Sequence, residues 1–302
     1  MIIECVPNIS EGRDVKLINT IVKDLRKIRN LELRDVHYDY DHNRSVFTLI
    51  GDYESVLKGV FKITQNCLHL DIDFHEGVHP CAGIIDVVPF VPIKGISYDK
   101  LKILVEQFAY EFFKNFGIPV YLYALSSKRP TTSKLATIRN KGINFIKSLS
   151  LEEKEYLPDI FENQIFHPTL GVTFIGVRYP LIAFNFNIKI TDAKEEIIKK
   201  VKIIAKELRE SSGGIKNLQA LVFFLASKNM VQLSTNILEA HKTDFLYIFD
   251  TIKKKLDFNG LKVDHCEIVG CLPSIVVSKI IKKYFRVKSF DYNKIVDFTV
   301  NS

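Results

Sequence analysis

Two histidines and a glutamate stand close together in the segment HEGVHP, residues 75 to 80. Its first, second and fifth residues match H-E-x-x-H, the pattern in which a helix presents two zinc-binding imidazoles and a general-base carboxylate. The pattern requires a helix, because only then do side chains four residues apart share a face. Gly77 destabilises a helix, and Pro80 pushes the residue before it toward an extended backbone. The spacing therefore matches a zinc site, but the residues between the ligands argue against one.

His79 is the second of these histidines, and its side chain suits proton transfer. An imidazole titrates near neutral pH, so one group can accept a proton and later return it. Pro80 removes a backbone donor and stiffens the chain beside the ring. A histidine that only satisfies polar neighbours would look the same in the sequence. On its residues alone, His79 is a candidate acid and base and also a candidate structural histidine.

Two charged residues lie in segments that are otherwise typical of strands. Asp86 stands inside the apolar run 84–91, where a carboxylate is costly unless it is paired. It either orients a catalytic group or binds a neighbouring backbone amide. Arg44 begins the segment 44–50, and its guanidinium can form two parallel hydrogen bonds with a substrate carboxylate. An exposed surface arginine is the alternative for Arg44.

Hydrophobic periodicity in the first half of the chain predicts the elements that carry these residues. Alternating apolar runs predict strands, and apolar residues three and four apart predict helices. The predicted elements are a strand at 2–6, a helix at 17–28, strands at 31–38 and 44–50, a helix at 56–67 and a strand at 84–91. This βαββαβ order is the split βαβ, or ferredoxin-like, plan.

The same order recurs in the second half of the chain. Its predicted elements are a strand at 181–188, a helix opened by a capping box of Asp192 and Glu195 and ended by Gly213-Gly214, strands at 218–226 and 230–237, a helix at 243–256 and a strand at 266–269. Between the halves we expect a helix at 101–116, a strand at 119–125 and a polar helical stretch at 133–157. We therefore predict an α/β (α+β) fold of two ferredoxin-like βαββαβ subdomains, 1–179 and 180–302, with a ligand groove between them.

Composition narrows the class of protein. The 302 residues are 47% hydrophobic and 25% charged, as in ordinary globular proteins. We find neither a signal peptide nor a run of eighteen apolar residues, and the five cysteines include no C-x-x-C pair. The net charge of +7 favours anionic ligands, but the lysines are spread along helices and form no dense basic run. These features predict a cytoplasmic protein that binds small molecules and neither nucleic acid nor membranes.

Short motifs occur in order along the whole chain. They are CVPNISEGR at 5–13, NR at 43–44, HP at 79–80, DVVPF at 86–90, PVYLY at 119–123, GVT at 171–173, IAFN at 182–185 and QLSTN at 232–236. Together they resemble the formiminotransferase family, including the formiminotransferase part of formimidoyltransferase-cyclodeaminase. The resemblance spans essentially the whole chain.

The resemblance implies an enzyme and a reaction. A glutamate formimidoyltransferase moves the formimidoyl group of N-formimidoyl-L-glutamate to N5 of tetrahydrofolate in histidine degradation. Tetrahydrofolate is then a co-substrate, no metal takes part, and the protein partner is a second copy in a homodimer. The family's catalytic histidine directly precedes the proline, so the resemblance assigns the acid and base role to His79. The imidazole would take a proton from N5 and give one to the leaving nitrogen.

The resemblance also implies residues that contact the two substrates. Substrate contacts fall on Asn8, Ser10, Arg44 and Asp86. Asn8 and Ser10 also suit turns and helix caps, which is the simpler explanation of both. Family members hold folate along a segment that here runs over 161–171 and ends in Phe166, His167, Pro168, Thr169, Leu170 and Gly171.

Two properties of this segment would suit a folate. Gly171 would allow close backbone approach, and Phe166 could pack on a pterin or benzoyl ring. A domain connection rich in turn-forming residues is the alternative explanation of the same segment.

Two residues beside His79 depart from the family pattern Gly-Glu-His-Pro-Arg. This chain has Val78 in place of the glutamate and Cys81 in place of the arginine. A neighbouring carboxylate would raise the basicity of the imidazole, and an arginine could bind an anionic substrate. Because residues 79 and 81 point to one side of an extended chain, a Cys/His nucleophilic pair is a further hypothesis.

Two alternatives to formimidoyl transfer stay open. The donor could be N-formyl-glutamate or 5-formyltetrahydrofolate, because formyl and formimidoyl groups share a planar carbon and differ by one heteroatom. The chain could also be a folate-binding paralogue without turnover. Binding of tetrahydrofolate with no transfer to any glutamate derivative would favour the paralogue.

Overall fold

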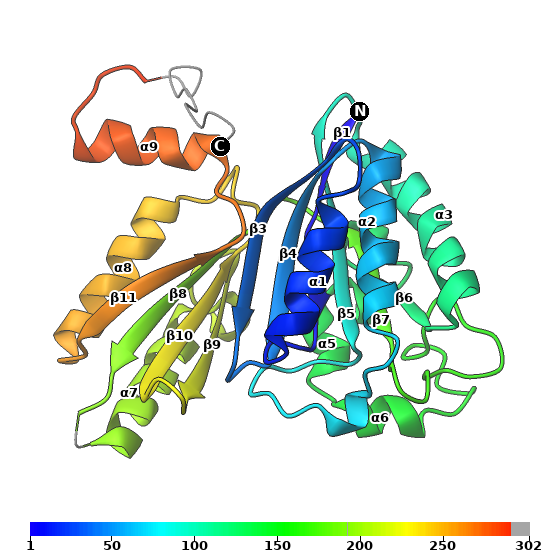
Figure 1. The fold of residues 1–302 in the computed structure, drawn as a ribbon. Helices are drawn as coiled ribbons and strands as arrows, with labels where there is room; N and C mark the ends of the chain where they lie inside the picture. The colour runs from blue at the N-terminus through cyan, green and yellow to red at the C-terminus, as the bar shows by residue number, and fades with distance from the viewer. Residues whose placement is uncertain (192, 291–302) are drawn as a thin grey trace. The chain divides into compact units, whose positions relative to one another are not determined.

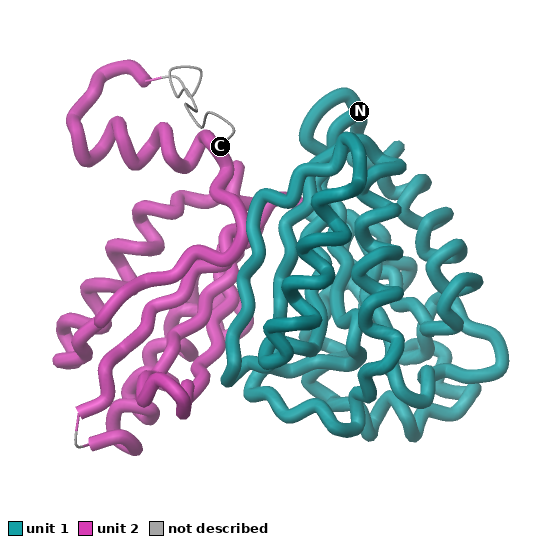
Figure 2. Tube along the Cα trace, viewed as in Figure 1, with its two compact units in different colours: residues 1–178 teal, residues 179–302 magenta. Residues whose placement is uncertain are grey.

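The computed structural model describes residues 1–191 and 193–290, in two compact units (Figure 2). The first unit is Met1–Arg178 and the second is Tyr179–Ser302. Each unit has its own β-sheet, with helices packed against it (Figure 1). The predicted mixed α/β class is confirmed. Among the described residues, no helix is both long and apolar enough to cross a membrane.

The sheet of the first unit brings three candidate residues together. Its first elements are β1 (Ile2–Cys5), β2 (Asn8–Ile9), α1 (Val15–Leu25), β3 (Leu31–Asp39), β4 (Arg44–Gly51), α2 (Tyr53–Asn66), the 3₁₀ turn η1 (Ile72–Phe74) and β5 (Ile85–Lys94). Strands β1 and β2 both pair antiparallel with β4 on one side and β5 on the other, so they share one interrupted strand position. Strand β3 pairs with the other edge of β4. Asn8, Arg44 and Asp86 therefore stand on three adjacent strand positions.

Helices α1 and α2 form because apolar residues recur at helical spacing and an aspartate caps each helix. Asp14 accepts a hydrogen bond from the backbone N–H of Leu17 at 2.9 Å. Asp52 accepts one from Ser55 in the same way, also at 2.9 Å. Each cap contributes about 1 kcal/mol to helix stability. The apolar faces of both helices belong to the main core of this unit.

The insertion after β5 extends the same sheet. Its elements are α3 (Tyr98–Phe116), β6 (Val120–Leu122), the 3₁₀ turn η2 (Ala124–Ser126), α4 (Pro130–Ser133), α5 (Leu135–Arg139), α6 (Ile143–Ser148) and β7 (Thr173–Val177). Strand β7 pairs parallel with β5, and β6 pairs parallel with β7. Helix α3 buries a stripe of phenylalanines, including Phe108 and Phe112, in the core of the unit.

The predicted polar helical stretch at 133–157 is wrong in its extent. Only short helices form there, separated at Gly142, whose φ of +82° is left-handed. Side chains hold the carbonyl groups of the loop that follows: Arg129 donates to the carbonyl of Lys154, and Thr131 Oγ1 donates to that of Glu155 at 2.6 Å. Because these carbonyls already have partners, the loop is stable without a helix.

The second unit is a four-stranded antiparallel sheet with helices between its strands. Its elements are β8 (Ile182–Lys189), α7 (Lys194–Leu208), the 3₁₀ turn η3 (Glu210–Ser212), β9 (Leu218–Leu225), β10 (Met230–Ile237), α8 (Phe245–Phe258), β11 (Val263–Val269) and α9 (Ser274–Tyr284). The strand order is β11-β8-β10-β9, and every neighbouring pair is antiparallel. The predicted capping residue Asp192 lies outside the described residues. Helix α9 has no counterpart among the predicted elements.

Alternate residues of the central strands β8 and β10 point to opposite faces of this sheet. One set, including Phe184, Phe186 and Leu233, packs in the core with α7 and α8. The other set is polar: Gln232 Nε2 donates to Asn187 Oδ1 at 3.0 Å. The period of two thus separates an apolar face from an amide-rich face within one sheet.

Candidate active site

The segment that contains His79 is an irregular loop between η1 and β5, not a helix. His75 has extended dihedral angles, φ −72° and ψ 120°. At Gly77 an added Cβ would lie 2.3 Å from the carbonyl oxygen of His42, so this glycine permits a close backbone crossing. The backbone N–H of Val78 donates to the carbonyl of Asp41 at 3.0 Å. The prediction that this segment would not form the helix of a zinc protease is confirmed.

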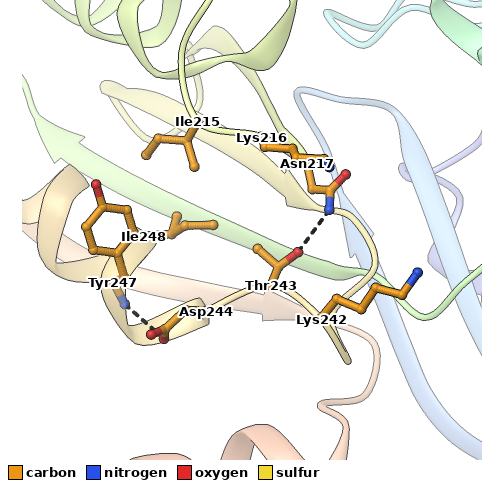
Figure 3. A pocket seen from close by; sticks show the side chains of 8 residues that line it. All are labelled: Ile215, Lys216, Asn217, Lys242, Thr243, Asp244, Tyr247 and Ile248. Atoms are coloured by element: carbon orange, nitrogen blue, oxygen red, sulfur yellow. Dashed lines mark hydrogen bonds between the residues drawn. The ribbon is translucent and has the colours of Figure 1, made fainter.

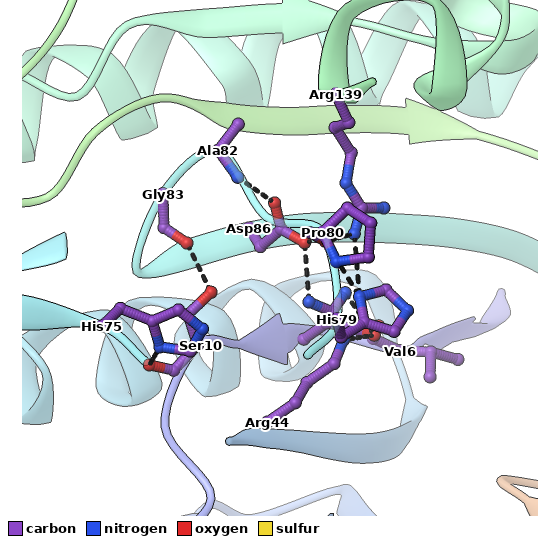
Figure 4. Close-up of polar contacts among 11 residues, drawn as sticks. Val6, Ser10, Arg44, His75, His79, Pro80, Ala82, Gly83, Asp86 and Arg139 are labelled. Atoms are coloured by element: carbon purple, nitrogen blue, oxygen red, sulfur yellow. Dashed lines mark hydrogen bonds and ion pairs between the residues drawn. The ribbon is translucent and has the colours of Figure 1, made fainter. Parts of the chain in front are cut away.

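The two histidines of the pattern have different surroundings. The Nδ1 atom of His75 lies 3.1 Å from the carbonyl oxygen of Ser10. The Nδ1 atom of His79 lies 2.8 Å from the carbonyl oxygen of Pro80 (Figure 4). Arg139 Nη2 lies 3.2 Å from the same Nδ1 atom. The carbonyl would accept from a protonated Nδ1, whereas a guanidinium can only donate to an unprotonated one, so the two contacts hold the ring without assigning its tautomer.

A buried ion pair lies beside His79. The carboxylate of Asp86 is fully buried, and the side chain of Arg44 is only 10% exposed. Arg44 Nη1 donates to Asp86 Oδ2 at 2.7 Å. The remaining donors of Arg44 reach Asn8, whose Oδ1 accepts from Nε at 3.1 Å and from Nη2 at 2.9 Å. The interpretation of Arg44 as an exposed surface arginine is therefore wrong, because burial requires the partner that Asp86 supplies.

Asp86 also binds the loop that carries His79. Its second oxygen, Oδ1, accepts a hydrogen bond from the backbone N–H of Ala82 at 3.0 Å. Of the two roles suggested for Asp86 by its sequence position, the binding of a neighbouring backbone amide is present, and the orientation of a catalytic group stays a prediction. The carboxylate links strand β4 to the loop before β5.

Arg139, at the end of α5, is part of the same cluster (Figure 4). Its Nη2 lies 3.2 Å from Asp86 Oδ2 and 3.2 Å from His79 Nδ1, and it donates a hydrogen bond to the carbonyl oxygen of Pro80. Its side chain is 10% exposed. The sequence analysis did not identify Arg139, because it lies in a polar stretch typical of a solvated surface. Its neighbour Ile138, which is fully buried, was the available signal that this stretch packs on the core.

The surroundings of His79 favour its neutral form. Burial lowers its pKa well below the ordinary value, and the positive charges of Arg44 and then Arg139 lower the pKa further. The hydrogen bond to Pro80 acts in the opposite direction but is weaker. The imidazole is therefore neutral at pH 7, with a free-base form able to accept a proton.

Asn8 and Ser10 have local hydrogen-bond partners. Asn8 Nδ2 donates to the carbonyl of Val6 at 2.7 Å, in addition to its bonds from Arg44. Ser10 Oγ donates to the carbonyl of Gly83 at 2.8 Å, and this serine is 2% exposed. Neither residue caps a helix, so the capping explanation is wrong: Asn8 fixes Arg44, and Ser10 fixes the loop before β5. Their substrate contacts stay predictions.

Cys81 is unsuited to the Cys/His nucleophilic pair. Burial raises the pKa of its thiol, and the negative charge of Asp86 raises it further. The thiol is therefore protonated at pH 7, whereas the nucleophile of such a pair is a thiolate. A hydrogen bond with Ser10 and the positive charges of Arg44 and Arg139 lower the pKa of this thiol, but their effect is weaker than that of burial.

Comparison with known proteins decides the family. The model of the N-terminal subdomain of the formiminotransferase domain matches residues 2–178, and the model of the formiminotransferase domain matches residues 183–297. The chain belongs to the formiminotransferase family.

Curated relatives match this chain over nearly its whole length. It is 36% identical to the glutamate formimidoyltransferase of Streptococcus pyogenes over 294 residues, 97% of this chain and 96% of the relative. It is 34% identical to that of Thermoplasma acidophilum over 298 residues, 98% of this chain and 96% of the relative. The formimidoyltransferase-cyclodeaminase of Mus musculus is 32% identical over 279 residues, which cover 90% of this chain and 50% of the mouse protein.

The segment 166–171, for which folate contacts are predicted, forms a tight turn beside the loop that carries His79. His167 and Gly171 exchange two backbone hydrogen bonds, each 3.0 Å long. His167 Nδ1 accepts from the backbone N–H of Leu170 at 3.0 Å, so this ring nitrogen is occupied. Gly171 has φ +75°, and a Cβ there would lie 2.4 Å from the carbonyl of Ala82. These local contacts explain His167, Leu170 and Gly171, and the folate contacts stay predictions.

Phe166 is the residue of this segment best suited to a ring ligand. It is partly buried and packs against two apolar clusters of the first unit, and Lys147 Nζ lies 5.0 Å from the centre of its ring. The ammonium group of Lys147 is also paired with the carboxylate of Asp73. Pro168 and Thr169 continue the turn, and Thr169 accepts through its carbonyl from the backbone N–H of Ile72 at 2.7 Å.

A pocket lies in the second unit (Figure 3). It is lined by Ile215, Lys216, Asn217, Lys242, Thr243, Asp244, Tyr247 and Ile248. Asp244 caps helix α8 through the N–H groups of Leu246 and Tyr247. Asn217 donates to Thr243 Oγ1 at 3.3 Å. Several polar groups of this pocket thus serve the start of α8.

Proposed function

We propose that this protein is a glutamate formimidoyltransferase, which moves a formimidoyl group from N-formimidoyl-L-glutamate to N5 of tetrahydrofolate. The observation that carries the proposal is His79: a neutral imidazole with Nδ1 beside a carbonyl oxygen, in a family whose curated members at 34% and 36% identity have this name. Tetrahydrofolate is a co-substrate, and the reaction belongs to histidine degradation and one-carbon metabolism.

The proposed mechanism uses His79 twice. N5 of tetrahydrofolate attacks the amidine carbon and forms a tetrahedral intermediate, while the imidazole of His79 takes the proton from N5. The imidazolium then gives that proton to the glutamate nitrogen, and the carbon–nitrogen bond to glutamate breaks. The products are 5-formimidoyltetrahydrofolate and glutamate, and His79 is neutral again.

The buried charges would attract the formimidoyl donor, N-formimidoyl-L-glutamate. Arg44 and Arg139 share one carboxylate, Asp86, so the cluster carries an excess of positive charge. The donor is an anion because of its glutamate carboxylates. The N–H groups of Arg44 already bind Asp86 and Asn8, so we propose that Arg44 attracts the anionic substrate by its charge. Asn8 and Ser10 then act by holding Arg44 and the catalytic loop.

The rest of the proposed assembly follows the family. The two units correspond to subdomains 1–179 and 180–302 with ferredoxin-like plans and a substrate groove between them. Folate binds along Phe166, His167, Pro168, Thr169, Leu170 and Gly171, and the active protein is a cytoplasmic homodimer. No metal takes part in the proposed chemistry.

One assay tests the reaction and its alternatives. The purified protein is incubated with tetrahydrofolate and either N-formimidoyl-L-glutamate or N-formyl-L-glutamate, and folate products are separated by chromatography. We expect 5-formimidoyltetrahydrofolate from the first donor and far less product from the second. If only the formyl donor gave a product, the reaction would be formyl transfer instead. Tetrahydrofolate binding in calorimetry, without turnover of either donor, would identify a folate-binding paralogue.

A further inference from the structure

Arg139 reaches the catalytic loop from a segment far away in the sequence. Helix α5 is anchored by the buried side chain of Ile138, which belongs to a separate apolar cluster of the first unit. The adjacent Arg139 extends from this anchor to the carbonyl of Pro80 and the carboxylate of Asp86. Its Nε is buried and, within the described residues, has no hydrogen-bond partner. The guanidinium is therefore held by the contacts of Nη2 (Figure 4).

We propose that Arg139 is a positioning residue, which fixes the orientation of the His79 imidazole through the carbonyl of Pro80 and through its own contact with Nδ1. The inference rests on the proposed role of His79 as acid and base. The carbonyl oxygen of Pro80 accepts from Arg139 Nη2 and lies 2.8 Å from His79 Nδ1, and the same Nη2 lies 3.2 Å from that Nδ1. Arg139 thus holds both the carbonyl beside the imidazole and the ring itself.

Asp86 completes this arrangement. One of its oxygens binds both arginines, and the other binds the backbone of Ala82 at the far side of the same loop. The loop is therefore held at Pro80 by Arg139 and at Ala82 by Asp86, with the two anchors bonded to each other. A ring held between two fixed partners has a defined orientation, as in metal sites where a second hydrogen bond orients a histidine.

Charge supports the same role. The groups that face His79 are Arg44 from β4, Arg139 from α5, His42 from the β3–β4 turn with its ring centre 5.7 Å away, and Cys81 and Asp86 nearer β5. Two of these are permanent cations, which repel an imidazolium. Removing the charge of Arg139 removes one of these repulsions, so the pKa of His79 must rise.

The test compares Arg139→Met with Arg139→Lys and with a control, Arg129→Met. Arg129 lies in the same insertion, and its guanidinium pairs with Asp159 and not with the His79 loop. The tautomer and pKa of His79 are measured by nitrogen NMR of the ¹⁵N-histidine-labelled resting protein, with His79→Gln to assign the signal. Turnover is measured as a function of pH in the same variants.

We expect Arg139→Met to raise the pKa of His79, to shift its tautomer equilibrium and to lower kcat at pH 7 by about 10- to 100-fold. Arg139→Lys, which keeps the charge, should keep the pKa close to that of the parent. Arg129→Met should leave both the tautomer and the pKa unchanged. An unchanged tautomer and pKa in Arg139→Met would overturn the inference, as would a rise in KM at constant kcat. The NMR measurement needs no turnover, so it tests Arg139 even if the parent protein transfers no formimidoyl group, a result that would refute the proposed function separately.

Discussion

Two histidines in the two units differ in the charges around them. His79 has guanidinium groups as neighbours, has its Nδ1 beside a carbonyl oxygen and is partly buried. His265, on β11, has carboxylates as neighbours: Asp264 at 2.9 Å and Glu267 at 3.6 Å, and its side chain is 45% exposed. The first environment keeps an imidazole neutral, whereas the second has neighbours of the opposite charge. The comparison shows that the neighbours of a histidine, more than its presence in a polar cluster, decide whether it can act as a base near neutral pH.

The two clusters also differ in how their polar groups are paired. In the first unit a single buried carboxylate serves two arginines, so the loss of one group leaves a buried charge without a partner. In the second unit, amides connect the partners: Asn187 contacts His265 Nε2 at 3.0 Å, and Gln232 donates to Glu267 at 3.1 Å. Amides and partly exposed groups tolerate substitution, because no isolated buried charge results.

Substitution of His79 and of His265 should give the largest difference between the two units, measured as turnover. His79→Gln should lower kcat by about 10²- to 10⁴-fold with little change in tetrahydrofolate affinity, because acid and base assistance acts in the transition state. His265→Gln is the matched control, with the same change of side chain in a different polar network, and should change kcat by less than about threefold. Steady-state kinetics and calorimetric folate titrations measure both. Equal losses in the two variants would contradict the assignment of His79.

Asp86 and Glu267 should differ next in their contribution to the free energy of unfolding. Asp86→Ala leaves two buried guanidinium groups without their shared partner and should lower the free energy of unfolding by about 3–5 kcal/mol. Glu267→Gln keeps an acceptor for Gln232 and removes only a partly exposed charge, so its cost should stay below about 1 kcal/mol. Urea unfolding followed by circular dichroism gives both values. A small cost for Asp86→Ala would mean that solvent already screens the two arginines.

The pH dependence of turnover provides a third contrast. Because burial and two arginines lower the pKa of His79, its neutral form persists as the pH falls through about 6.5, the ordinary histidine value. The acidic limb of kcat should therefore lie well below that value. The stability of the fold changes with pH in the same direction. The unfolded chain binds the proton of His79 more readily, so the contribution of the neutral imidazole to stability is present above about pH 6.5 and is lost as the pH falls below it. An acidic limb at or above the ordinary value would show that the two arginines do not act on His79.

Local pattern predicted most of the strands and helices, because each buries one face and shows its period in the sequence. The apolar run around Asp86 predicted a buried strand with a paired carboxylate, and the structure supplies the partner in Arg44. Arg139 could not be predicted in this way, since its role depends on an insertion that returns to the loop across more than fifty residues. Val78 shows the same limit: no property of a valine indicates that its backbone binds Asp41. Long-range positioning by the backbone has no local signature.

The smallest effect should come from Glu76, the residue that would be the general base if HEGVHP were a zinc site. Its segment is an irregular loop in which His75 bonds to the backbone of Ser10 and His79 to that of Pro80, so the two imidazoles have separate partners. Glu76 is exposed, and an exposed carboxylate that contacts no reacting group contributes little to turnover. Glu76→Gln should therefore change kcat by less than about twofold, and a chelator should leave turnover unchanged. If Glu76→Gln and the chelator both abolished activity while His79→Gln kept it, the loop would have to rearrange around a metal, and His79 would be a ligand instead of an acid and base.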